Sequence, residues 1–168
     1  MIETSKYHPI PQPDEIDIRE KEDAMGAYLM MFASIGAGLP LPFINLLAAV
    51  IYYYINKSKS RFVRFHSFQS VVSQMPITIL NGIGVVWFFR ILFNSNMYYT
   101  DFFKGYILML ITANILYFIF SIIAAVKARK GYFYYFLFFG RLSYHQVYKV
   151  RPDDEGGLLE KVNVPPKM

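Results

Sequence analysis

The side chains that could do chemistry in this sequence are few, and they lie far apart. The histidines, His8, His66 and His145, fall in different segments, so they do not form a metal-ligand pair. Residues 24–100 contain no Asp or Glu, and Asp101 stands alone in a predicted loop. The chain has no cysteine, which excludes disulfides and thiol chemistry. Because an enzyme in a membrane needs ionisable or metal-binding groups at its site, we predict no catalytic residue, no metal site and no cofactor.

Four amide side chains, Gln69, Gln74, Asn81 and Asn114, interrupt segments that are otherwise apolar. A buried amide needs a hydrogen-bonding partner, so each is expected to bond a neighbouring helix or a backbone carbonyl. The functional alternative is that the amides line a polar crevice open to a substrate segment. Asn81 and Asn114 lie at similar depths on predicted antiparallel neighbours, so we expect them to face each other or a shared water.

Composition and charge favour a membrane protein. The 168 residues are 55% hydrophobic and only 17% charged, whereas soluble domains are about a quarter charged. Residues 24–152 hold 12 Lys or Arg against one acid, while residues 1–23 hold 3 against 7 acids. Basic loops between apolar helices suit an anionic lipid surface rather than a nucleic acid. The expected partners are therefore anionic headgroups of membrane lipids and other membrane-protein subunits, with no nucleic acid.

The basic residues gather on one side of the predicted membrane domain. With four spans, the side that carries both tails and the 56–64 loop has 15 Lys or Arg, and the other side has only Arg90 and Lys104. By the positive-inside rule the basic side, with both termini, is cytoplasmic. The residues predicted to face headgroups are Lys57, Lys59, Lys127, Arg129, Lys130 and Arg141.

Four apolar segments predict an all-α fold, an integral membrane four-helix bundle. Residues 24–38 and 43–56 would each measure only ~22 Å as helices, which is short of the ~30 Å hydrocarbon core. Two short, tilted spans are preferred there, and a re-entrant hairpin remains the alternative. Residues 61–93 predict a long third helix, amphipathic in its first half and kinked at Pro76. A fourth helix is predicted from about residue 102 to residue 126, with a cap at its start and a glycine stop after its end.

Polar and aromatic segments flank the predicted bundle. Asp23 or Glu22 is expected at the N-terminus of the first helix, where an anion is favoured. The aromatic run of residues 132–139 is too short to span, so an interfacial segment in the headgroup layer should follow the fourth helix. The predicted divisions are a polar cytoplasmic tail at 1–23, a four-span membrane domain at 24–142 and a polar C-terminal tail at 143–168.

The stretch Ser60–Ser70 carries the most specific pattern in the chain. Basic residues open it, aromatic residues then recur every three or four positions, and an aromatic-His-x-x-Gln core closes it. We interpret it as the membrane-surface hinge that leads into the longest helix. Its motif and interface candidates are Arg61, Phe62, Arg64, Phe65, His66 and Gln69.

This motif and the run Lys127–Tyr132, with Tyr135 and Arg141, resemble small four-helix bacterial membrane proteins of a family of unknown function. Their best-known relative is the twenty-kilodalton subunit of the chloroplast inner-envelope protein-import translocon. The resemblance covers residues 24–142, and Phe136 stands where the family usually has proline. It implies a four-helix fold with both termini on one side, and work beside a protein-conducting complex.

Two function classes follow from the sequence. The first is a non-catalytic multi-pass subunit or scaffold of a complex in the bacterial cytoplasmic (inner) membrane, for which the resemblance suggests protein translocation. The alternative is a small transporter or pore-forming membrane protein. The missing acids and the shortness of the chain argue against an ion-coupled carrier.

Overall fold

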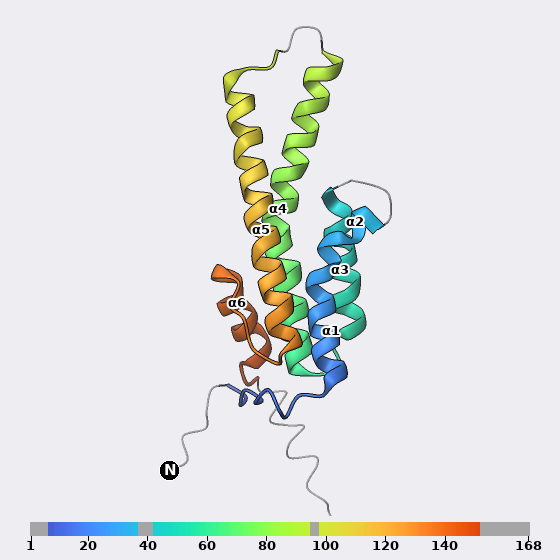
Figure 1. Cartoon of the computed structure of the whole chain (residues 1–168), viewed down its shortest axis with the longest axis vertical. Helices are drawn as coiled ribbons and strands as arrows, with labels where there is room; N and C mark the ends of the chain where they lie inside the picture. The colour runs from blue at the N-terminus through green and yellow to red at the C-terminus, as the bar shows by residue number, and fades with distance from the viewer. Residues whose placement is uncertain (1–6, 37–41, 95–97, 152–168) are drawn as a thin grey trace, which may run out of the picture.

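Helices make up all the regular elements of the described residues, 7–36, 42–94 and 98–151, in a computed structural model of the chain (Figure 1). Helices α4 and α5 form a long antiparallel pair, and the other helices gather around its lower half. The all-α prediction is confirmed for this part of the chain. The elements are α1 (Ile18–Leu29), the 3-10 helix η1 (Met30–Phe32), α2 (Ala33–Gly36), α3 (Pro42–Asn56), α4 (Arg61–Phe93), α5 (Asp101–Arg129) and α6 (Leu137–Tyr148).

Helix α1 begins at Ile18, inside the segment predicted to be a polar tail. Asp17 is its N-cap, and the Asp17 side chain accepts a hydrogen bond from the Arg19 backbone N–H at 2.7 Å. The prediction that Asp23 or Glu22 starts this helix is therefore wrong. The reason is local: Asp17 satisfies a free N–H of the first turn, while Ile16 just before it is buried and anchors the entry of the chain.

Helices α4 and α5 are the two described helices that are long and apolar enough to cross a membrane. They measure ~50 Å and ~44 Å at 1.5 Å per residue. Helix α3, apolar over Phe43–Asn56, is shorter, and Figure 1 shows the α1–α3 hairpin ending well below the far end of α4 and α5. The four-span bundle thus stays a prediction, as does the choice between two short spans and a re-entrant hairpin.

Helix α4 has its predicted limits and remains one helix through Pro76, where the kink stays a prediction. The Ser60 hydroxyl caps it by accepting a hydrogen bond from the Val63 N–H at 3.2 Å. The predicted polar surface on the first half is wrong, because neighbouring elements bury its polar residues; Arg61 is exposed, and Arg64, Phe68 and Val72 are half-buried along one face. Its buried residues are Phe62, Val63, Phe65, His66, Ser67, Gln69, Ser70, Val71, Ser73 and Gln74.

The aromatic segment after α5 enters the bundle instead of lying only at its surface. Gly131, with φ of 80°, ends α5 as predicted, since glycine tolerates the left-handed region. Residues 132–136 then run back beside the bundle, and α6 returns along α4 (Figure 1). Gly140 permits this turn: a Cβ there would lie 2.4 Å from the Tyr135 Cα. The prediction of a purely interfacial segment is wrong, because Phe136 lies in the core with only 3% of its surface exposed.

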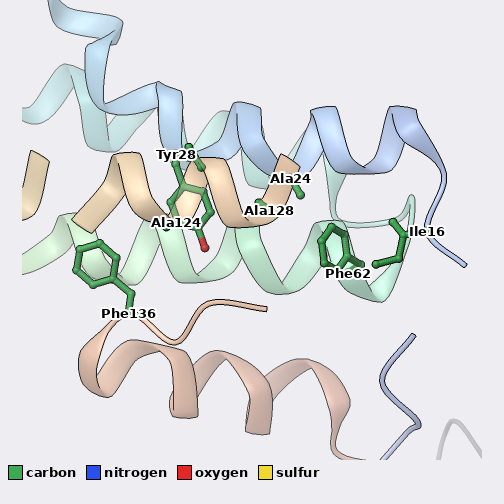
Figure 2. Close-up of a cluster of buried hydrophobic side chains, with 8 residues drawn as sticks. Ile16, Ala24, Tyr28, Phe62, Ala124, Ala128 and Phe136 are labelled. Carbon is green, nitrogen blue, oxygen red and sulfur yellow. The ribbon is translucent and has the colours of Figure 1, made fainter. Parts of the chain in front are cut away.

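The main hydrophobic cluster joins these elements (Figure 2). Ala24 on α1 and Ala124 and Ala128 on α5 are all fully buried. Their small side chains allow α1 and α5 to approach closely, as helices in membranes commonly do. The cluster consists of Ile16, Ala24, Tyr28, Phe62, Ala124, Ala125, Ala128 and Phe136.

The two ends of the described chain meet at the lower end of the bundle in Figure 1. Tyr7 and Lys149 form an antiparallel bridge, and the His8 backbone N–H donates to the Tyr148 carbonyl at 2.8 Å. The N-terminal segment therefore crosses the end of the bundle and contacts the end of α6. The divisions at residues 23 and 142 stay predictions, although α1 and α6 each cross one of these positions.

Candidate functional site

A buried hydrogen-bond network joins α1 to α4 at the motif identified in the sequence. The Tyr28 hydroxyl lies 2.9 Å from His66 Nδ1, and Gln69 Nε2 donates to the Tyr28 hydroxyl oxygen at 2.7 Å. Because that oxygen accepts from Gln69, its own proton is available to His66 Nδ1. With the Tyr28 hydroxyl as the donor, the imidazole is neutral and carries its proton on Nε2, which has no hydrogen-bond partner among the described residues. His66 is fully buried, so it cannot reach a lipid headgroup.

Gln69 also holds the segment that precedes α6. Its Nε2 donates to the Tyr134 carbonyl at 2.9 Å, and its Oε1 accepts from the Phe136 N–H at 3.4 Å. The side-chain amide thus bonds two backbone groups that have no helix of their own to bond them. The aromatic-His-x-x-Gln pattern therefore joins α1, α4 and the inserted segment inside the protein.

Aromatic rings surround the imidazole of this network. The Phe62, Phe65 and Phe133 centroids lie 4.5, 5.0 and 5.8 Å from the centroid of His66. Phe62 and Phe65 are buried, whereas Arg61 and Arg64 of the same motif point outward. Arg61 approaches His8 Nε2 at 3.2 Å, and Arg64 Nε donates to the Lys57 carbonyl at 2.9 Å. The six motif candidates thus divide into a buried group of four and two arginines that contact loop and tail residues.

A polar cavity of about 260 Å³ lies higher in the bundle, between the α1–α3 hairpin and the α4–α5 pair. Asn81 and Asn114 both line it and bond each other as a reciprocal amide pair, with N···O distances of 3.1 and 2.9 Å. The predicted contact between these two residues is confirmed. Gln74 also lines the cavity, and its Oε1 is buried without a hydrogen-bond partner among the described residues. The remaining lining residues are Met31, Phe32, Ser34, Asn45, Ile77, Thr78, Tyr117 and Phe118.

The structure thus separates the four amides that the sequence singled out. Gln74, Asn81 and Asn114 share the cavity, whereas Gln69 belongs to the histidine network below it. Sequence reasoning missed Tyr28 of the network and Asn45 of the cavity, where the Asn45 Oδ1 accepts from the Ser34 N–H at 2.7 Å. Asn45 could have been found, because it is an amide within the apolar run Phe43–Val50.

The charged end of the bundle is partly neutralised by the acidic residues of α1. Lys59 Nζ lies 2.6 Å from Asp23 Oδ2, and Arg129 Nη2 lies 3.0 Å from Glu22 Oε1. Two of the predicted headgroup-facing cations are therefore shared with acids of the same chain. Among the others, the Lys57 ammonium lies over the Tyr54 ring and that of Lys127 over the Tyr132 ring, while Lys130 and Arg141 are exposed.

The described residues contain no group of three or more His, Cys, Asp or Glu side chains that could hold a metal ion. Burial raises the pKa of the Tyr148 hydroxyl beside this end of the bundle, an effect that nearby Arg61 opposes. Tyr148 is therefore neutral at physiological pH.

The helical fold, the two membrane-length apolar helices and the polar interior define a small α-helical membrane protein. The chain belongs to the magnetosome magnetite crystal formation protein family, MamF/MmsF, whose family model matches residues 20–142. Membership implies a small membrane protein involved in magnetosome crystal formation. No curated protein and no solved structure matches the chain.

This finding corrects the family expected from the sequence. The resemblance to relatives of the chloroplast import translocon was wrong, because the family model that matches is that of the magnetosome family. The short motifs that suggested it are explained by the structure instead. Gln69 and the buried aromatic residues hold an inserted segment, a packing requirement that carries no information about protein translocation.

Proposed function

We propose that the chain is a non-catalytic multi-pass subunit of the magnetosome membrane that supports crystal formation by assembling with other membrane proteins. The observation that carries this proposal is the upper half of the α4–α5 pair, which extends beyond the other helices (Figure 1). Its outward side chains are large and apolar. They include Ile79, Ile83, Val86, Phe88, Phe89, Leu92 and Phe93 on α4, and Phe102, Leu108, Met109, Ile111 and Ile115 on α5.

The contrast with the interior supports a scaffold rather than a catalyst. Polar side chains in the lower bundle bond one element to another, as Gln69 and Ser70 do through the Tyr134 and Ala27 carbonyls. Such bonds hold helices together where lipid gives no hydrophobic driving force between them. The free apolar surface of the upper pair is then available to helices of partner subunits.

The basic end of the bundle supports a second class of partner, the anionic headgroups of membrane lipids. Lys130 and Arg141 are exposed there, and each basic residue near an anionic surface contributes about 1 kcal/mol of attraction. We place this end in the cytoplasm, in a magnetosome membrane derived from the inner membrane. The excess of Lys and Arg supports that orientation. Reporter fusions at Met1, Asn96 and Met168 test it, and a non-cytoplasmic signal at either terminus would contradict it.

The main test combines co-purification with crystal measurement. Ile111→Trp with Ile115→Trp changes the shape of the exposed α5 face and keeps it apolar, whereas Ile111→Leu with Ile115→Leu preserves its volume. In magnetite-forming cells we expect the Trp pair, but not the Leu pair, to reduce the partners recovered in mild detergent and to alter crystal size in electron micrographs. The amount of each variant in the membrane controls for folding. A wild-type chain recovered only alone would contradict the proposal.

A small transporter or pore is the second candidate, and the 260 Å³ polar cavity is the observation that favours it. Removing polar groups from the cavity tests this hypothesis, because Thr78→Val and Asn45→Leu replace polar lining atoms with apolar ones of similar size and add no charge. Solute flux into vesicles that falls with both substitutions would support a pore. No flux above that of protein-free vesicles would leave the subunit as the remaining reading.

A further inference from the structure

An apolar groove runs along the outer face of α4, away from the basic end of the bundle. Its volume is about 480 Å³, and it lies in the part of α4 that is apolar and largely exposed. Gly82 lines the groove, and a Cβ at this position would meet nothing within 4 Å, so the space beside it is open. Its lining residues are Ile79, Gly82, Ile83, Val86, Trp87 and Arg90.

The groove has the length of one lipid leaflet. From Ile79 to Arg90 the helix rises ~16 Å, which is about half of the ~30 Å hydrocarbon core. Trp87 forms a fixed wall, because its ring packs against Phe102, Phe103 and Tyr106 of α5 with centroid distances of 5.6, 5.2 and 5.5 Å. A tryptophan beside a charged residue is typical of the depth where acyl chains meet headgroups.

Arg90 closes one end of this apolar groove with a positive charge. It lies in the last turn of α4 and is exposed. Asp101 is the one acid between residues 24 and 152, and its Oδ1 accepts from Lys104 Nζ at 2.9 Å. Arg90 therefore presents a guanidinium, the group best suited to bind a phosphate in a bidentate manner.

We propose that this groove binds one anionic phospholipid, with an acyl chain between Ile79 and Trp87 and the phosphate on Arg90. The choice of ligand rests on charge complementarity. The groove is as long as one leaflet and apolar, and it ends at a guanidinium at headgroup depth. A phosphate attached to an acyl chain matches both features. A lipid with net negative charge is preferred because a zwitterionic lipid brings its own cation to the same place. The site lies at the opposite end of the bundle from the basic cluster. It shares Ile79, Ile83 and Val86 with the apolar surface offered to partner subunits, so a partner helix on this part of α4 would exclude the lipid.

The chain carries its own reporter for this site, since Trp87 is its single tryptophan. Trp87 fluorescence of the full chain is measured in vesicles that contain brominated phosphatidylglycerol and in vesicles that contain brominated phosphatidylcholine. The bromine atoms quench tryptophan fluorescence on contact. We expect the relative binding constant from Trp87 quenching to favour the anionic lipid by about fivefold, the effect of one basic residue near the surface. Lipids at the basic cluster do not contribute, because Arg61 lies ~39 Å along α4 from Trp87.

Matched substitutions locate the effect. Arg90→Gln should abolish the preference, whereas Lys104→Gln, at the same end of the bundle, should retain it. Gly82→Leu should lower quenching by both lipids, whereas Gly105→Leu, another glycine with open space around it, should not. Arg90→Gln alters an exposed side chain, so it tests the proposal even if Gly82→Leu fails to fold.

Three results would overturn the proposal. Equal quenching by the two lipids in the wild-type protein would remove the headgroup preference. An unchanged preference in Arg90→Gln would remove the role of the guanidinium. Quenching by neither lipid would indicate that protein covers the groove.

Discussion

The two halves of α4 lie in opposite surroundings. From Phe62 to Gln74 most of the helix is buried by α1, α3, α5 and α6, and its polar side chains face those neighbours. From Met75 onward most side chains are apolar, and many of them are exposed. The buried half therefore gains stability from hydrogen bonds and close packing, whereas the exposed half needs lipid or partner helices around it.

Gln69→Leu should cause the largest loss of stability, because it leaves the Tyr134 carbonyl and the Phe136 N–H buried without a partner. We expect the free energy of unfolding in detergent to fall by about 3 kcal/mol or more, at 1–3 kcal/mol for each unsatisfied group. Gln146→Leu on the exposed surface of α6 makes the same chemical change and should cost little. Equal losses in the two variants would mean that the network does not hold the inserted segment.

Gly140→Ala tests the close approach of α6 to the inserted segment. The added Cβ would collide with the Tyr135 backbone, so unfolding free energy should fall by about 1–3 kcal/mol, the usual cost of overpacking. Protease cleavage between residues 132 and 136 should become faster. The control is Gly105→Ala on the exposed part of α5, where nothing lies within 4 Å of the new Cβ. Faster cleavage in the control as well would point to a general loss of helix packing.

The Asn81–Asn114 pair lies where the buried and the exposed halves of α4 meet. Its contribution to stability shows whether hydrogen bonds between helices still stabilise the protein at this level. Asn81→Leu and Asn114→Leu should each cost about 0.6–2 kcal/mol in detergent unfolding. The double variant should cost less than the sum of the two, because one substitution already removes the shared bonds. Strict additivity in detergent unfolding would mean that the two side chains do not bond each other.

The ion pair at the basic end should contribute least. The Lys59 and Asp23 side chains are 38% and 20% exposed, so Lys59→Gln should lower unfolding free energy by only about 0.2–1 kcal/mol. Added salt should reduce the difference, because exposed charges are screened. The swapped variant, Asp23→Lys with Lys59→Asp, should recover most of the loss. A loss well above 1 kcal/mol would indicate that this ion pair contributes as much stability as the bonds of the buried network.

The sequence predicted helix ends well where neighbouring residues include a capping side chain or a terminating glycine. Ser60 and the following aromatic spacing predict the start of α4, and Thr100 accepts from the Phe103 N–H at the start of α5, as expected for a cap. Similar logic failed for α1, because the acidic run of residues 14–23 contains several side chains that could serve as its cap. Asp17 is selected because its side chain accepts from the Arg19 N–H and because Ile16 just before it packs in the core.

The sequence predicted which polar residues form the candidate site, but for most of them it did not predict the hydrogen-bonding partner. The sequence identifies Gln69, Gln74, Asn81 and Asn114 as polar groups that need a hydrogen-bonding partner within apolar segments. It paired Asn81 with Asn114 because both helices and their short connection are local features. It could not pair Gln69 with residues 134–136, because that contact depends on a chain reversal after Gly131.

By itself, the sequence determines the membrane character of the chain, the limits of its two long helices and the basic side of the bundle. These properties follow from composition and from hydrogen-bonding groups a few residues apart. Tertiary structure alone decides that the acids of α1 pair with Lys59 and Arg129, and that the aromatic run enters the core. The physical reason is that a polar or aromatic side chain can be satisfied by lipid headgroups or by another helix, and only the packed fold selects between them.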